Sequence, residues 1–114
     1  MLYVCAGRGP NRPPLAAERA EEEGRAFAAD HGFTVIETVR DPYGVPDPVA
    51  RAGWRRVKEL AEAGGIGAVI ARWPVTISPD QAPDLRHREV NELLKQGVHV
   101  LYSWSPLTAR GVVR

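Results

Sequence analysis

The chain opens with the stretch LYVCA at residues 2–6, which runs directly into GRGPNRPP at residues 7–14. Five consecutive apolar residues predict a strand buried on both faces, as in the interior of a parallel sheet. The glycines and prolines that follow cannot continue a strand, so they predict a loop that offers backbone N–H groups and two arginine side chains. Because α/β folds build their sites at the carboxyl ends of interior parallel strands, we look for a site at this edge first.

Outward from this strand, short apolar segments alternate with longer amphipathic ones. The amphipathic segments, each followed by a glycine that favours termination, predict helices over residues 15–31, 49–63 and 84–96. The short apolar segments predict strands over residues 33–39, 66–71 and 98–102. Loops are expected over residues 40–48 and 72–83, and an irregular tail over residues 105–114.

Helical spacing also predicts which side chains of the later helices are buried. The second helix is expected to bury Trp54, Val57, Leu60 and Ala61. The third is expected to bury Leu85, Val90, Leu93 and Leu94.

Strands that alternate with helices of about a dozen residues predict right-handed βαβ crossovers. The expected fold is a single three-layer α/β domain over residues 1–114, flavodoxin-like, with four mainly parallel strands in the order 2-1-3-4 and helices on both faces. The carboxyl ends of the first three strands then meet at one edge. That edge carries Arg8, Arg40, Asp41, Arg72 and Trp73.

Composition limits the other possibilities. Charged residues make up 25% of the 114 residues and apolar residues 44%, which excludes a disordered chain. No apolar run approaches the ~18 residues of a spanning helix, and no signal peptide precedes the first strand, so we expect no membrane partner and a cytoplasmic location. The single cysteine, Cys5, excludes an intrachain disulfide and is expected to be a small buried apolar residue. The histidines lack metal-ligand spacing, so no metal or other cofactor is expected.

The candidate binding groups allow two interpretations each. Five arginines could line an anion site at the sheet edge, or could be ordinary solvated loop residues: Arg8, Arg12, Arg40, Arg51 and Arg72. Asp41 could act as a base or hold an arginine, or could simply begin a turn before Pro42. Trp73 and Trp104 could stack on a base or a partner, or could cover the end of the sheet.

Six short motifs occur in a recognisable order, with LYV at 2–4, HGF at 31–33, Asp41 before a Gly44 turn, RAGW at 51–54, AVI at 68–70 and LLKQGV at 93–98. Together they resemble the catalytic domain of the serine recombinases, the resolvase and invertase family. The resemblance covers about residues 2–102 and implies a resolvase-like fold. It also implies an activity, in which a serine hydroxyl attacks a DNA phosphodiester while arginines hold the phosphate.

The catalytic motifs of that family are incomplete here. Its first strand ends in Tyr-x-Arg-x-Ser, whereas this chain has Cys5 at the arginine position and Gly7 at the serine position. Its third strand is followed by Asp-Arg-x-x-Arg, and the corresponding positions are Pro74, Val75 and Ser78. Of the usual active-site set, the resemblance leaves Asp41 and Arg51.

We therefore expect a catalytically inactive resolvase-like domain with a regulatory role, which binds DNA or a partner recombinase and is a monomer or weak homodimer. The phosphate- or DNA-binding candidates are Arg8, Arg12, Arg51 and Arg72. The alternative is a domain or enzyme that binds a nucleotide or other small phosphorylated ligand at the same edge through Arg8, Arg72 and Asp41.

Overall fold

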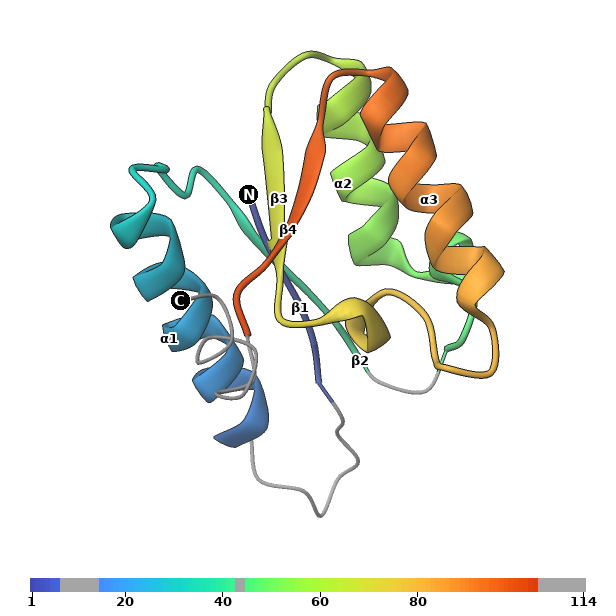
Figure 1. Cartoon of the computed structure of the whole chain (residues 1–114), viewed down its shortest axis with the longest axis horizontal. Coiled ribbons are helices and arrows are strands. Elements are labelled where there is room, and N and C mark those ends of the chain that lie inside the picture. The colour runs from blue at the N-terminus through green and yellow to red at the C-terminus, as the bar shows by residue number, and fades with distance from the viewer. Residues whose placement is uncertain (7–14, 43–44, 105–114) are drawn as a thin grey trace, which may run out of the picture.

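A computed structural model describes residues 1–6, 15–42 and 45–104 of the chain (Figure 1). Its four strands are all parallel and form one sheet in the order β2-β1-β3-β4. The strands are β1 (Leu2–Ala6), β2 (Thr38–Pro42), β3 (Ala68–Ala71) and β4 (His99–Tyr102). The predicted fold class and strand order are confirmed.

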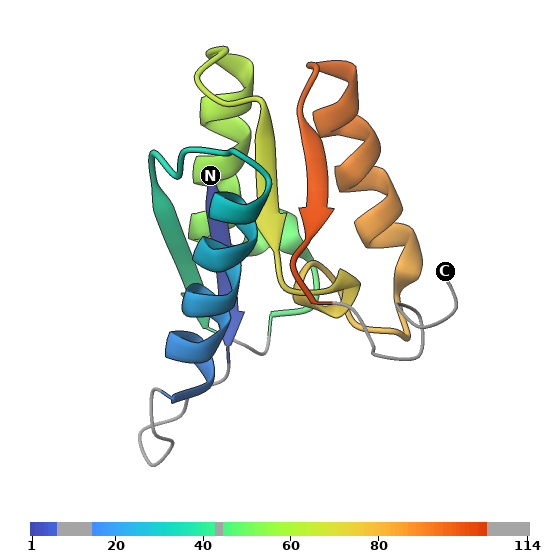
Figure 2. The same ribbon diagram turned by 60° about the vertical axis from the view of Figure 1, so that its left-hand side comes forward.

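Three α-helices complete the layers. They are α1 (Leu15–Asp30), α2 (Ala52–Glu62) and α3 (Pro83–Lys95), and two 3₁₀ turns, η1 (Pro48–Ala50) and η2 (Pro74–Thr76), lie in the connections. Helix α1 covers one face of the sheet, and α2 and α3 cover the other side by side (Figures 1 and 2). No helix in the described part of the chain is both long and apolar enough to cross a bilayer.

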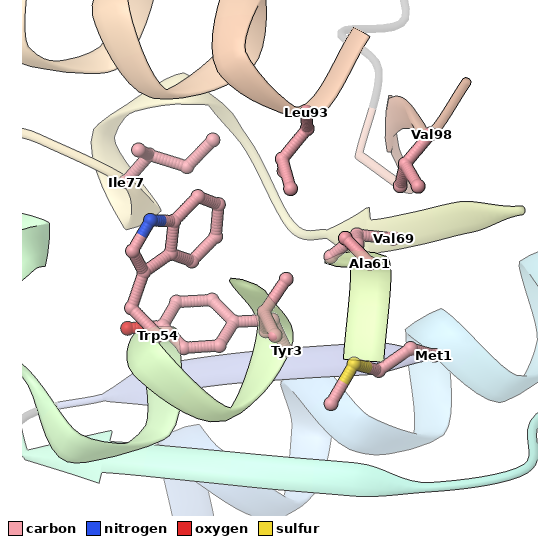
Figure 3. Close-up of a cluster of buried hydrophobic side chains, with 9 residues drawn as sticks. Met1, Tyr3, Trp54, Ala61, Val69, Ile77, Leu93 and Val98 are labelled. Carbon is pink, nitrogen blue, oxygen red and sulfur yellow. The ribbon is translucent and has the colours of Figure 1, made fainter. Parts of the chain in front are cut away.

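Each face of the sheet has its own apolar core. Because successive side chains of a strand point to opposite faces, β1 contributes to both. Leu2 and Val4 pack beneath α1 with Ala28 and Ile70. The larger cluster beneath α2 and α3 comprises Met1, Tyr3, Trp54, Val57, Ala61, Val69, Ile77, Leu93 and Val98 (Figure 3). In it, the rings of Tyr3 and Trp54 meet edge to face with centroids 5.0 Å apart.

The position of the second strand was predicted wrongly. The β-branched composition of residues 33–39 favoured a strand there, but β2 begins at Thr38 and extends to Pro42. Pairing explains the shift, since β1 begins at Leu2, which stands opposite Thr38, and earlier residues have no strand partner. As a result, Arg40 and Asp41 lie in the strand and not in the predicted loop.

Two further expectations need correction. The predicted helix over residues 49–63 is interrupted, because Arg51 has an extended backbone (φ −98°, ψ 132°) between η1 and α2. On α3, Leu94 was expected to be buried but is 50% exposed. Glu89 of the same helix is buried instead, with 1% exposure. Its carboxylate is paired there with Trp54 and Lys58 of α2.

Candidate functional site

Asp41, at the carboxyl end of β2, caps a helix that belongs to another part of the chain. Its Oδ1 accepts a hydrogen bond from the Gly53 N–H at 2.7 Å, and its Oδ2 accepts one from the Trp54 N–H at 3.0 Å. The residue before α2, Arg51, supplies no side-chain cap of its own. A carboxylate at this position satisfies two of the free N–H groups of the helix and faces the positive end of its dipole.

The phenol of Tyr3 joins Asp41 to Arg51. Its hydroxyl donates to Asp41 Oδ2 at 2.7 Å and accepts from Arg51 Nη1 at 3.1 Å. Burial and the hydrogen bond to Asp41 raise the pKa of Tyr3 well above its ordinary value, although the nearby Arg51 opposes that rise. The Tyr3 hydroxyl therefore stays protonated near neutral pH and remains the donor to Asp41.

Arg51 connects three segments of the fold. Its Nη1 also donates to the carbonyl of Thr76 in η2 at 2.8 Å, and its Nε donates to the carbonyl of Val45 at 2.8 Å. Asp41 and Arg51 are each only 6% exposed. Asp41 and Arg51 are the two residues that match the active-site pattern of the family that the sequence resembles. Both are thus engaged in hydrogen bonds within the protein.

Arg72 lies on the other face of the sheet. Its Nε is 3.2 Å from Glu23 Oε1 of α1, whereas Arg51 contacts Tyr3 on the α2 face. The structure therefore does not bring these two candidates together. Arg40, also named from the sequence, pairs with Glu21 of α1. Arg8, Arg12 and Gly7 lie outside the described residues.

Two hydroxyl groups near the sheet edge are also engaged. Ser78 is fully buried, and its Oγ donates to the carbonyl of Ala82 at 2.8 Å. Thr76 is buried as well, and its Oγ1 accepts from the Trp73 N–H at 3.4 Å. Both hydroxyls are therefore engaged within the protein.

Three of the positions that depart from the family motif carry uncharged side chains where the motif has charged ones. They are Cys5, Pro74 and Val75. Cys5 is half-buried in β1, where its Sγ lies 3.7 Å from the carbonyl of Pro42. Burial raises the pKa of the Cys5 thiol, which disfavours the reactive thiolate. Pro74 and Val75 lie in η2 and provide no charge.

A second cluster occupies the carboxyl ends of β3 and β4. The Arg72 guanidinium lies over the Trp73 ring, 4.6 Å from its centroid, and the Trp73 and Trp104 rings meet edge to face at 4.9 Å. Ser103 Oγ donates to Glu23 Oε1 at 3.3 Å, so Ser103 and Arg72 both contact the same carboxylate oxygen. The two tryptophans lie where the sequence placed them, at the ends of adjacent strands.

The buried Glu89 forms a network that the sequence did not reveal. Its Oε1 accepts from Trp54 Nε1 at 2.8 Å and lies 3.1 Å from Lys58 Nζ, and its Oε2 accepts from Arg88 Nε at 2.8 Å. Burial alone would raise the pKa of Glu89, but the hydrogen bonds from Trp54, Arg88 and Lys58 outweigh it and lower the pKa below the ordinary value. The network connects α2 to α3.

The described residues contain no group of three or more histidine, cysteine, aspartate or glutamate side chains arranged to hold a metal ion. What the edge offers instead is a capped helix start beside α2 and, at the carboxyl ends of β3 and β4, an arginine with two indoles. The first is closed to a ligand, and the second is partly open to solvent.

No protein-family model matches the chain, and no curated protein matches its sequence. Solved structures do match. The C-terminal catalytic domain of ISC1926 TnpA, an IS607-like serine recombinase, superposes with a TM-score of 0.77 over 98% of this chain and 74% of that one, at 14% identity. The N-terminal catalytic domain of TP901-1 integrase gives a TM-score of 0.75 over 90% of this chain and 75% of that one, at 13% identity.

The fold is that of a serine recombinase catalytic domain. A third structure, the first open reading frame of transposon ISC1904 from Sulfolobus solfataricus P2, agrees with a TM-score of 0.65, at 8% identity, over 92% of this chain and 66% of that one. At such low identities the likeness establishes the fold and carries no activity with it.

Proposed function

We propose that this resolvase-like domain acts in site-specific DNA recombination without cleaving DNA itself, by binding DNA or a partner recombinase. The observation that carries the proposal is the burial of Asp41 and Arg51, both 6% exposed, in hydrogen bonds to Gly53, Trp54, Tyr3, Val45 and Thr76. Groups so engaged hold the fold together and leave little with which to act on a phosphodiester.

The residues at the other motif positions support the same conclusion. Phosphodiester cleavage needs an attacking hydroxyl and several charged donors, and the loss of one positioned donor commonly costs ~10²- to 10³-fold in rate. Gly7 offers no hydroxyl and Cys5 no positive charge. Ser78, the nearest serine after β3, is buried and bonded to Ala82.

The proposal predicts that the purified chain neither nicks supercoiled plasmid nor becomes attached to a DNA 5′ end. The double variant Cys5→Arg with Gly7→Ser should also be inactive, because Val75 and Ser78 still leave a phosphate without its other clamps. Plasmid nicking on agarose gels and denaturing gels for a protein–DNA adduct measure this. A covalent adduct with the unaltered chain would refute the claim of inactivity.

Binding requires a separate experiment. We expect a salt-dependent gel shift with long DNA, since phosphate contacts release counterions. Alanine at Arg8, Arg12 and Arg72 together should weaken this shift, whereas Arg55→Ala with Arg56→Ala on the exposed side of α2 should change it only slightly. Arg51 is left unaltered because its loss would disturb the fold. If the α2 pair matters more than the other three, the binding surface is not at the carboxyl edge.

The alternative, a site for a nucleotide or sugar phosphate, has weaker support. It needs Asp41 as a ligand contact, and that carboxylate already accepts three hydrogen bonds. A saturable thermal shift with such a ligand, without any DNA gel shift, would favour the alternative.

A further inference from the structure

The indoles of Trp73 and Trp104 meet because neighbouring parallel strands carry them to the same edge. Beyond the ends of β3 and β4 the ladder continues, with the Ser103 N–H donating to the Ala71 carbonyl and the Trp104 N–H to the Arg72 carbonyl, both at 2.9 Å. This fixed backbone pairing holds the two rings edge to face at 4.9 Å. Their arrangement therefore follows from the sheet and does not depend on a mobile loop.

Neither indole completes a core. The two apolar clusters of the described residues, and the half-buried side chains packed against them, do not include Trp73 or Trp104. Trp54, by contrast, is fully buried. Trp104 is 40% exposed, so a large apolar side chain that meets only Trp73 among the aromatic rings remains in contact with water.

The geometry leaves an aromatic face open. In an edge-to-face pair, each ring keeps at least one face uncovered by its partner. The Arg72 guanidinium covers a face of Trp73, 4.6 Å from the ring centroid. The remaining open surface is therefore chiefly that of Trp104.

Arg72 supplies a positioned charge beside this surface. Its Nε lies 3.2 Å from Glu23 Oε1 without a hydrogen bond of good geometry, its guanidinium stacks on Trp73, and Ser103 donates to the same Glu23 oxygen. A guanidinium held in this way can hydrogen-bond a base carbonyl or a phosphate oxygen with little further ordering. Aromatic rings with an adjacent arginine are the elements with which proteins bind unpaired bases.

We propose that Trp73, Trp104 and Arg72 form a stacking platform for an unpaired nucleobase, so that this edge binds single-stranded DNA in preference to duplex. The preference arises because the faces of bases in a duplex are covered by their neighbours, whereas an unpaired base can leave its stack. The inference deepens the proposed function and rests on its DNA-binding part.

The test compares three DNAs of equal length: oligo(dT), an abasic oligonucleotide with the same number of phosphates, and a duplex. Binding is followed by fluorescence anisotropy of labelled DNA and by quenching of tryptophan emission, to which the fully buried Trp54 contributes little change. Oligo(dT) should bind about tenfold or more tightly than the abasic strand, the loss expected when one base stack is removed. Duplex should resemble the abasic strand.

Variants identify the platform. Trp104→Ala should remove the difference between oligo(dT) and the abasic strand, and Trp104→Phe should restore most of it because a ring is retained. Leu94→Ala, at an exposed apolar side chain on α3, should leave the difference unchanged. Thermal unfolding of each variant checks that the fold is intact.

The outcomes separate the inference from the function on which it rests. If all three DNAs bind equally, or if Trp104→Ala keeps the discrimination, the stacking platform is refuted while DNA binding stands. If none of them binds, DNA binding fails and the platform with it, which leaves a partner recombinase as the object of the proposed function.

Discussion

Replacing Gly53 with alanine tests whether Asp41 is held in place by the fold. An alanine Cβ at this position would lie 2.7 Å from Asp41 Oδ2, 2.8 Å from its Cγ and 2.9 Å from its Oδ1. These separations are too short for nonbonded atoms, so the carboxylate has to move. When the carboxylate moves, it loses three hydrogen bonds that it now accepts. Their donors are the Gly53 N–H at 2.7 Å, the Trp54 N–H at 3.0 Å and the Tyr3 hydroxyl at 2.7 Å.

The expected loss of stability follows from these contacts. Removing a helix cap costs about 1 kcal/mol, and stranding a buried hydroxyl costs a further ~1–3 kcal/mol. The lower end applies to Tyr3, because its hydroxyl still accepts from Arg51. Alanine recovers up to ~1 kcal/mol through its higher helix propensity. The net destabilisation is about 1–2 kcal/mol, which lowers Tm by ~4–8 °C for a chain of this length.

Thermal or urea unfolding followed by circular dichroism measures the effect, with Gly67→Ala as the matched control. An alanine Cβ at Gly67 meets no atom within 4 Å, so that variant should stay within ~0.5 kcal/mol of the unaltered chain. In an Asp41→Ala background, Gly53→Ala should cost much less, because the carboxylate that it displaces is already gone. Equal losses in both backgrounds, or a Gly53→Ala variant as stable as Gly67→Ala, would refute the capping role of Asp41.

Two further predictions concern acid stability and assembly. Because the folded pKa of Glu89 lies below its ordinary value, its stabilising contribution is complete above the unfolded pKa of about 4.3 and disappears as pH falls through the lower folded value. Glu89→Gln should flatten this part of an acid-unfolding curve, and an unchanged curve would show that other carboxylates dominate. The chain should be a monomer or weak dimer at micromolar concentration, and light scattering that reveals a tight dimer would contradict this.

The sequence predicted the elements whose signals are local. The apolar run at residues 2–6 and the glycine that follows α1 are read within a few residues, and both β1 and α1 lie where they were expected. The position of β2 is not determined by a local signal. It depends on where β1 begins, because Leu2 pairs with Thr38, 36 residues later in the chain. Composition at residues 33–37 favours a strand, but without a partner it forms none.

The buried polar residues were harder to predict for the same reason. Glu89 is buried because Trp54 and Lys58 reach it from another helix, and nothing in the helical pattern of α3 indicates those partners. Asp41 left a weak signal, since α2 begins after Arg51, a poor capping residue, and has a glycine in its first turn. A helix start that lacks its own cap indicates that another segment supplies one.

The same contacts give a physical reason why Asp41 and Arg51 are the active-site positions that still match the family pattern. Asp41 caps α2 and Arg51 ties the residue 45 segment and η2 to β1 through Tyr3, so the fold itself requires both. Cys5, Pro74, Val75 and Ser78, at other positions of that pattern, take no part in these contacts. If the proposed function holds, the fold can therefore stand without the residues that cleavage would need. We therefore expect substitutions of Asp41 or Arg51 to lower the free energy of unfolding. Thermal or urea unfolding, and not a DNA cleavage assay, is the measurement that should show their effect.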